Sequence, residues 1–210
     1  MQDLWLRLER FFSEQHWAVA LRPGAEEAEI VRLEQVLELR LPADLRTSLQ
    51  IHNGEDGRQG IRWLPDMLLL PIAGILAHWN TQQSYYARWG EDEYADDAQD
   101  GGRIRNVIFH PRRIPLAMRL DEEGGLWLDF TPGPEGMPGQ VIMDITECDF
   151  IVLAPNFRAF LVRYIELLES GVYFYDAETY QQVIPQNLEA LHSGAVRQDA
   201  FYRRLFPLKS

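Results

Sequence analysis

Residues able to bind a metal ion or to act as a nucleophile are few in this sequence and are spread along it. No two histidines are four residues apart, the spacing that places two zinc ligands on one helix face; they are His16, His52, His78, His110 and His192. Cys148, the one cysteine, lies in an apolar run without an evident base, so we expect a buried structural thiol. The sequence has no GxSxG motif and no phosphate-binding loop. These patterns predict a protein without a metal centre or a cofactor.

Carboxylates are the most abundant reactive groups of the chain. There are 32 Asp and Glu against 20 Lys and Arg, which gives a net charge of −12. Two carboxylates that face each other across a cleft can hydrolyse a glycosidic bond. The residues that could supply such a pair are Asp121, Glu122, Glu123 and Asp129. Because no motif fixes their relative positions, a carboxylate-based hydrolase is a second alternative, and we expect a protein that is not an enzyme.

Six carboxylates crowd into the ten residues from Glu91 to Asp100, EDEYADDAQD, and account for half of the net charge. Their spacing does not match a calcium-binding loop, which has D-x-[DN]-x-[DN]-G and a final glutamate. Like charges at this density repel one another and bury little surface. We therefore expect residues 91–102, which end in two glycines, to be a mobile acidic insertion.

The excess of acidic residues indicates which partners to expect, and the apolar segments indicate the location. Phosphate backbones repel a surface of this charge, so we expect no nucleic-acid binding, whereas a basic protein would be attracted. The N-terminal stretch MQDLWLRLERFF lacks the basic start and the continuous apolar run of a signal peptide. The apolar run from Met67 to Ile75 is too short to cross a bilayer. We expect a cytoplasmic protein that does not bind a membrane.

Apolar residues repeat with the period of a helix in four segments of the first half of the chain. These segments span residues 4–12, 26–37, 41–53 and 72–90. Pro42 suits the first position of the third helix. Asn53-Gly54 can supply the left-handed residue that ends the third helix, and Gly90 can cap the end of the fourth. The first half is therefore predicted to be helical.

From Ile104 the pattern changes to short runs rich in β-formers, at residues 126–130, 141–145 and 150–153. Their close spacing favours an antiparallel meander. Asn156 can cap a further helix with an apolar stripe up to Leu168, and short helices are expected at 187–191 and 199–206. We predict an α+β fold: N-terminal helices, a mostly antiparallel sheet, and a C-terminal helix packed on it. Residues 1–171 would form the domain, and residues 172–210 an extension packed on it.

Several short strings follow one another in a characteristic order. They are LRPGA from Leu21, LPADL from Leu41, HNGEDG from His52, FHP from Phe109, IPL from Ile114, GGLWLD from Gly124, PGP from Pro132, GQVI from Gly139 and VLAPNF from Val152. Their order and spacing over residues 1–170 resemble the SUKH superfamily, the domain of Smi/Knr-type fungal cell-wall assembly regulators and of many bacterial proteins. The acidic insertion and the tail after Gly171 lie outside this resemblance.

The resemblance implies a binding role rather than catalysis, because the family has no shared catalytic constellation. Bacterial members are regarded as immunity proteins, each of which neutralises a secreted toxin, often a nuclease, by direct contact. Fungal members are regulatory scaffolds. We therefore expect an immunity protein first, and as the alternative a scaffold in cell-wall or envelope synthesis, signalling or secretion.

A basic toxin domain would be met by carboxylates that take the place of its substrate's phosphates, with an aromatic anchor among them. The acidic insertion offers both. The predicted contacts are therefore Glu91, Asp92, Glu93, Tyr94, Asp96, Asp97 and Asp100, followed by Glu55 and Asp56 in the loop after the third helix.

Overall fold

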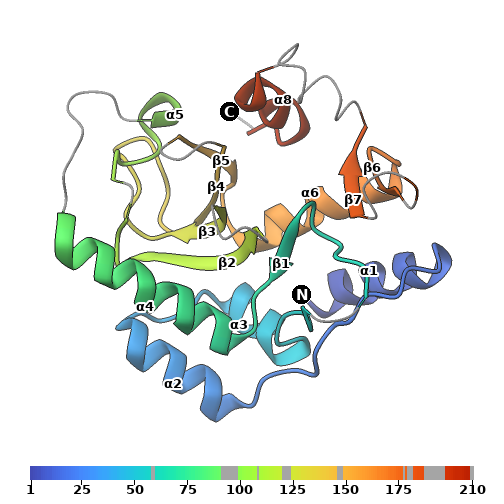
Figure 1. The fold of residues 1–210 in the computed structure, drawn as a ribbon, viewed down its shortest axis with the longest axis horizontal. Helices are drawn as coiled ribbons and strands as arrows, with labels where there is room; N and C mark the ends of the chain where they lie inside the picture. Colours follow the sequence, from blue (N-terminus) through green and yellow to red (C-terminus); the bar gives the residue numbers. More distant parts are fainter. Residues whose placement is uncertain are drawn as a thin grey trace.

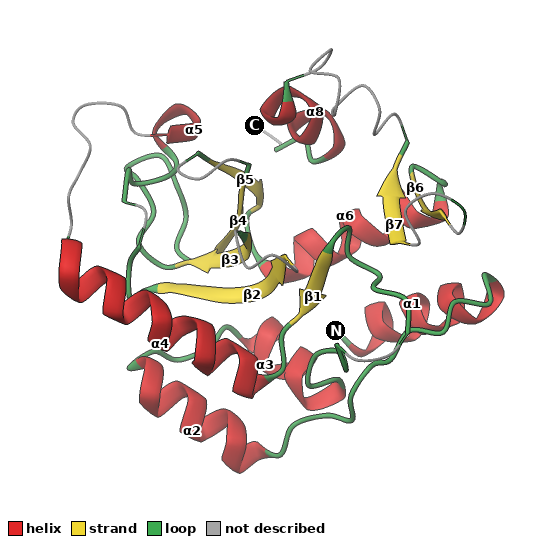
Figure 2. Cartoon of the chain, viewed as in Figure 1, coloured by secondary structure: helices red, strands yellow, loops and turns green. Residues whose placement is uncertain are grey.

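The computed structural model describes residues 1–57, 60–90, 99–107, 109–119, 124–145, 149–176, 178, 182–186 and 197–208. Figure 1 shows the path of the chain through its helices and strands. Helices predominate before residue 99 and strands after it (Figure 2). This arrangement confirms the predicted α+β class.

The N-terminal helices form where the apolar stripes predict them. α1 buries one continuous face, and α2 begins with a capping box in which the Glu26 N–H donates to Glu29 Oε2 at 2.9 Å. α1 packs on α3 and α6, whereas α2 packs on α3 and α4. The bounds are α1 Gln2–Glu14, α2 Glu27–Leu37, α3 Ala43–Ile51 and α4 Ile72–Trp89.

The end of α3 differs from the prediction. His52 follows α3 in an extended conformation with φ −138°, so Asn53-Gly54 does not cap this helix. Gly54 does take a left-handed conformation, with φ +72°, and a Cβ there would lie 2.4 Å from the backbone nitrogen of Pro71. The close approach of two backbones therefore requires this glycine. Gly90, by contrast, ends α4 as predicted.

The five-stranded sheet is an antiparallel meander in the order β1-β2-β3-β4-β5, as predicted. Three strands lie within one residue of the expected runs, whereas β1 and β2 were not predicted as separate strands. β2 contains Pro115, and its register with β3 shifts at this point. The strands are β1 Met67–Leu69, β2 Arg113–Arg119, β3 Gly125–Asp129, β4 Gln140–Asp144 and β5 Phe150–Ala154.

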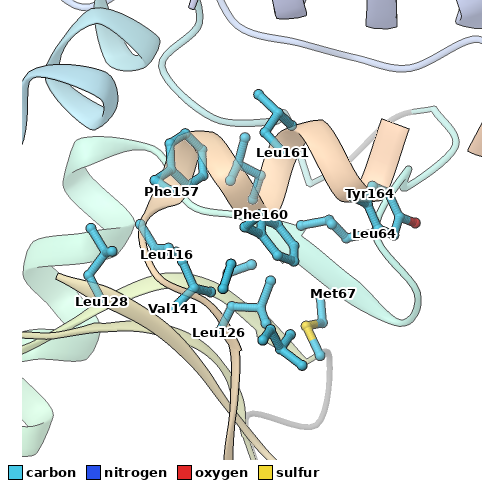
Figure 3. Packing of buried hydrophobic residues seen from close by; sticks show 14 of the residues in the cluster. Leu64, Met67, Leu116, Leu126, Leu128, Val141, Phe157, Phe160, Leu161 and Tyr164 are labelled. Carbon is cyan, nitrogen blue, oxygen red and sulfur yellow. The ribbon is translucent and has the colours of Figure 1, made fainter. Parts of the chain in front are cut away.

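The main core lies between this sheet and α6 (Phe157–Glu169). Asn156 caps α6, since its Oδ1 accepts a hydrogen bond from the Ala159 N–H at 2.8 Å. Figure 3 shows side chains of the sheet, among them Leu126 and Val141, turned towards Phe160 of α6. Every residue of β3, β4 and β5 is buried, so both faces of the sheet are covered.

The C-terminal part contains a hairpin that the sequence patterns did not predict. β6 (Tyr173–Asp176) and β7 (Gln182–Pro185) pair as a separate two-stranded sheet. α8 (Gln198–Leu205) follows close to the predicted position and packs beside β5 (Figure 1). The helix predicted at 187–191 lies outside the described residues.

The end of the predicted acidic insertion is part of the fold. α5 (Gln99–Gly102) is a single turn in which Asp100, Gly101 and Gly102 have positive φ angles of 54°, 65° and 86°. Two of these three residues are glycines, which take this conformation without steric cost. Among the described helices, none is long and apolar enough to cross a membrane.

Candidate functional site

The string that begins at His52 connects the loop after α3 to other elements. His52 Nδ1 lies 3.1 Å from the carbonyl oxygen of Arg22, and Nε2 lies 2.6 Å from Oε1 of Glu9 in α1. The ring of His52 thus lies between the start of the LRPGA string and α1. Asn53 Oδ1 accepts from the Ile72 N–H at 2.8 Å and so caps α4. His52 and Asn53 thus connect the loop after α3 to α1 and to the start of α4.

Glu55 was predicted to contact a partner, but it is buried beside β1 with 3% of its surface exposed. Its N–H donates to the Leu69 carbonyl at 2.9 Å, and its Oε2 accepts from the Leu69 N–H at 2.8 Å. Glu55 therefore takes the place of a neighbouring strand at this edge of the sheet. Burial raises the pKa of its carboxyl from 4.5 to about 7, against the opposing effects of the Leu69 and Trp63 N–H groups and of Arg62.

Asp100, another predicted contact, closes the opposite edge of the sheet and is 8% exposed. Its Oδ2 accepts from the Val152 N–H at 2.8 Å, and Gln99 Oε1 accepts from the Phe150 N–H at 2.7 Å. Asp100 also forms an ion pair with Arg203 of α8. The carboxylates at both edges are thus used to pair backbone amides. The structure therefore does not offer Glu55 or Asp100 to a partner.

Asp56 is the predicted contact that the structure places at the surface. Its side chain is 41% exposed, and Oδ1 lies 4.0 Å from Nη2 of Arg22. The remaining predicted contacts lie outside the described residues; they are Glu91, Asp92, Glu93, Tyr94, Asp96 and Asp97. The structure thus brings Glu55 and Asp56 together in one loop and places Asp100 at the opposite edge of the sheet.

Asp129, which the hydrolase alternative requires at a cleft, has 0% exposure and belongs to a polar ladder across three strands. It lies opposite Arg113 of β2 and Gln140 of β4. Its Oδ1 is 3.6 Å from Arg113 Nε, and its Oδ2 accepts from Gln140 Nε2 at 3.0 Å. Burial lowers the pKa of Arg113, while Asp129 acts to raise it. A carboxylate enclosed in this way cannot reach a substrate. Asp121, Glu122 and Glu123 lie outside the described residues.

The glycine-rich loop after β3 holds the turn that contains Asp100. A Cβ on Gly133 would lie 2.3 Å from the Gly102 carbonyl oxygen, and one on Gly136 would lie 2.1 Å from that of Arg103. The Gly133 N–H donates to the Arg103 carbonyl at 3.0 Å. Only glycine permits this contact between two backbones. The loop therefore supports the sheet edge.

The histidines and acids in the described part of the chain form no metal centre. His110 Nδ1 accepts a hydrogen bond from the Arg112 N–H at 3.0 Å, which shapes the turn before β2. No group of three or more His, Cys, Asp or Glu side chains among the described residues is arranged to hold a metal ion. Cys148 and His192 lie outside these residues.

Asp44, in the LPADL string, has a role that the sequence patterns did not reveal. Its Oδ1 accepts from the Leu45 N–H at 2.8 Å at the start of α3, and its Oδ2 accepts from the Arg158 N–H at 2.9 Å at the start of α6. One carboxylate thus serves the positive ends of two helices. An acid after Pro42 signals a helix start, but nothing local indicates the second helix.

The strings that carry the resemblance therefore mostly build the fold, and the match to a known family covers most of the same region. The model of the SMI1 / KNR4 family (SUKH-1) matches residues 24–163. The chain belongs to this family. The matched residues include the whole five-stranded sheet and the first half of α6.

Two fungal proteins are similar to this chain. The cell wall biosynthesis/cell cycle regulator smi1 of Schizosaccharomyces pombe is 32% identical over 192 residues, which covers 85% of this chain and 38% of that protein. The glucan synthesis regulatory protein of Neurospora crassa is 27% identical over 214 residues, which covers 83% of this chain and 40% of that protein. The chain thus spans about two-fifths of each relative. Both names favour the regulatory alternative over the immunity hypothesis.

Proposed function

We propose that this chain is a regulatory protein-binding module that acts in the control of cell-wall or envelope synthesis and catalyses no reaction. Membership of the SMI1 / KNR4 family carries the proposal, together with the names of the two fungal relatives as regulators. The use of the family strings supports it: Asn53, Asp129 and Gln140 serve the fold and leave no polar constellation for chemistry among the described motif residues.

An aromatic pair at the C-terminal part of α4, shortly before the acidic segment in the sequence, supports binding to a protein. Tyr85, in the last turns of α4, is 39% exposed and has its ring 4.8 Å from that of Phe109. Aromatic side chains at a surface are frequent anchors of protein interfaces. Six residues later the chain enters the acidic stretch that begins at Glu91. We propose that this stretch, together with Asp56, meets a basic partner.

Immunity to a toxin is the second candidate function. A net charge of −12 suits an inhibitor that blocks the basic cleft of a nuclease, and this charge favours the candidate. In this case, too, the acidic stretch that begins at Glu91 would bind a basic protein. We place either function in the cytoplasm. We also propose that residues 1–171 are the binding domain and that residues 172–210 are an extension packed on it.

Affinity capture of the tagged full chain from its own cells separates the two functions. The regulatory proposal predicts several partners of cell-wall synthesis or signalling in less than equimolar amounts. It also predicts altered wall composition when the gene is deleted. One equimolar partner that kills a host when expressed alone, and not beside this chain, would replace regulation by immunity.

The acidic stretch can be tested with variants matched in charge. Asp96→Asn with Asp97→Asn should slow association with a captured partner and flatten its dependence on salt, because two attractive charges are lost. The control pair is Glu14→Gln with Glu38→Gln, which removes the same charge from two exposed positions, in α1 and at the end of α2. Equal association rates for both pairs in low salt, measured by surface plasmon resonance, would remove the stretch from the interface.

A further inference from the structure

α8 presents one apolar face to the rest of the molecule. Phe201, Leu205 and Phe206 are 2%, 7% and 4% exposed, whereas Arg203 and Arg204 keep exposed surface. The Phe206 ring stacks on Phe160 of α6, with centroids 5.8 Å apart. Residues spaced i, i+4 and i+5 thus anchor a short amphipathic helix. The same pattern serves helices that dock into grooves of other proteins.

The surface under α8 lies within the residues that the family model matches, whereas α8 lies outside them. Leu153, Met143 and Phe160 lie within the matched residues 24–163, and α8 begins at Gln198. They line a cavity of about 30 Å³ that Tyr202 and Phe206 close from the side of α8. A void of this size could enclose one water molecule by volume alone, so the packing between α8 and the domain is incomplete. A bulkier anchor would fill it better.

α8 depends on its contacts with the domain. It has 8 residues, fewer than an isolated helix needs to be stable in water. Its N-cap residue, Arg197, has no side-chain acceptor for the first amides of the helix. The polar ties that join α8 to the domain include the ion pair of Arg203 with Asp100 and the bond from Arg163 Nε to the Leu205 carbonyl at 2.7 Å.

We propose that the surface under α8 is a docking site for an amphipathic helix of a partner protein, and that α8 occupies it as an internal substitute. The inference rests on the proposed protein-binding function and names its partner class. The Asp100 side chain is 0% exposed and pairs with Arg203. If α8 left, this buried carboxylate would lose its cation, which is costly. The partner helix must therefore bring an Arg or Lys two residues after its first aromatic anchor.

A peptide that copies α8 tests this proposal without knowledge of the partner. The probe is a fluorescein-labelled peptide of residues 197–208, and binding to the full chain is followed by fluorescence anisotropy. Phe201→Ala in the full chain weakens the internal helix, so the probe should bind this variant at least tenfold more tightly than it binds wild type. Gln198→Ala, at an exposed position of α8, should behave as wild type. A probe with Arg203→Glu should bind the F201A chain at least tenfold more weakly.

Hydrogen exchange of the unaltered chain gives an independent measurement. The amides of α8 should exchange at least a hundredfold faster than those of β3 and β4, because the helix opens alone. Equal protection of α8 and the sheet would overturn the proposal, as would an F201A chain that loses its tertiary structure or binds the probe no better than wild type. These outcomes would leave α8 as a permanent part of the core. The same outcomes would leave the proposed regulatory function open, because affinity capture tests that function separately.

Discussion

Glu55→Gln should remove a large part of the dependence of stability on pH. The ordinary pKa of this carboxyl is 4.5, and burial raises it to about 7 in the folded chain. Between these values the folded state therefore holds a proton that the unfolded state has lost. Stability then falls as the pH rises, because the folded state must give up this proton at a greater cost. The neutral amide of the E55Q variant would carry no such proton to lose.

The two pKa values set the size of the effect. Each pH unit between 4.5 and about 7 corresponds to about 1.4 kcal/mol, so ionisation of Glu55 lowers the free energy of unfolding by about 3 kcal/mol. Glutamine keeps an oxygen for the Leu69 N–H, but its amide nitrogen cannot accept from the Trp63 N–H. That loss costs about 1–3 kcal/mol at every pH. The slope against pH, rather than the stability at one pH, is therefore the test.

Urea denaturation followed by tryptophan fluorescence at pH 5, 6, 7 and 8 measures this slope. The decline in free energy of unfolding from pH 5 to pH 8 should be about 3 kcal/mol smaller for E55Q than for wild type. Asp144 also has a raised pKa, about 6, because of burial, and it acts in the same direction in both proteins. Its contribution cancels in the difference. Glu14→Gln, at an exposed position of α1, is the charge-matched control and should keep the wild-type slope.

Equal slopes for E55Q and wild type would refute the reasoning. In that case the Glu55 carboxyl would remain hydrated in the folded chain, and its place beside β1 would be wrong. If the free energy of unfolding of wild type did not fall between pH 5 and pH 8, the carboxyls of both Glu55 and Asp144 would be hydrated in the folded chain.

Three further substitutions test the contacts that build the fold. Asn53→Ala removes the cap of α4 and should lower the free energy of unfolding by about 1 kcal/mol in urea denaturation; an unchanged value would place the cap elsewhere. Asp129→Ala leaves Arg113 buried without its carboxylate and should cost about 3–5 kcal/mol in the same assay, so a neutral result would contradict the ladder. Gly136→Ala places a methyl group 2.1 Å from the Arg103 carbonyl and should cost about 1–3 kcal/mol. A melting temperature equal to that of wild type would show that the two loops do not touch.

The elements that the sequence predicted well are those with a strong local pattern. The stripes of α1 and α6 repeat over 13 residues each, and such a repeat fixes which face is buried whatever the helix packs on. β1 has 3 residues and β2 contains a proline, so neither produces a clear alternation. The β6–β7 hairpin was missed because its strands have 4 residues each. Short strands depend on their neighbours for stability.

The sequence pattern did not predict which carboxylates are buried and paired. Composition indicated an acidic protein and the ordered strings indicated a family, but neither showed which of Glu55, Asp56 and Asp100 would be buried. The tertiary structure buries two of these three and exposes the third. Asp100 meets Arg203 across 103 residues, and Asp44 meets the Arg158 amide across 114. Burial and pairing depend on groups that only folding brings together, so the sequence by itself determined the class, the family and the helices. The tertiary structure decided which charges belong to the fold and which remain at the surface.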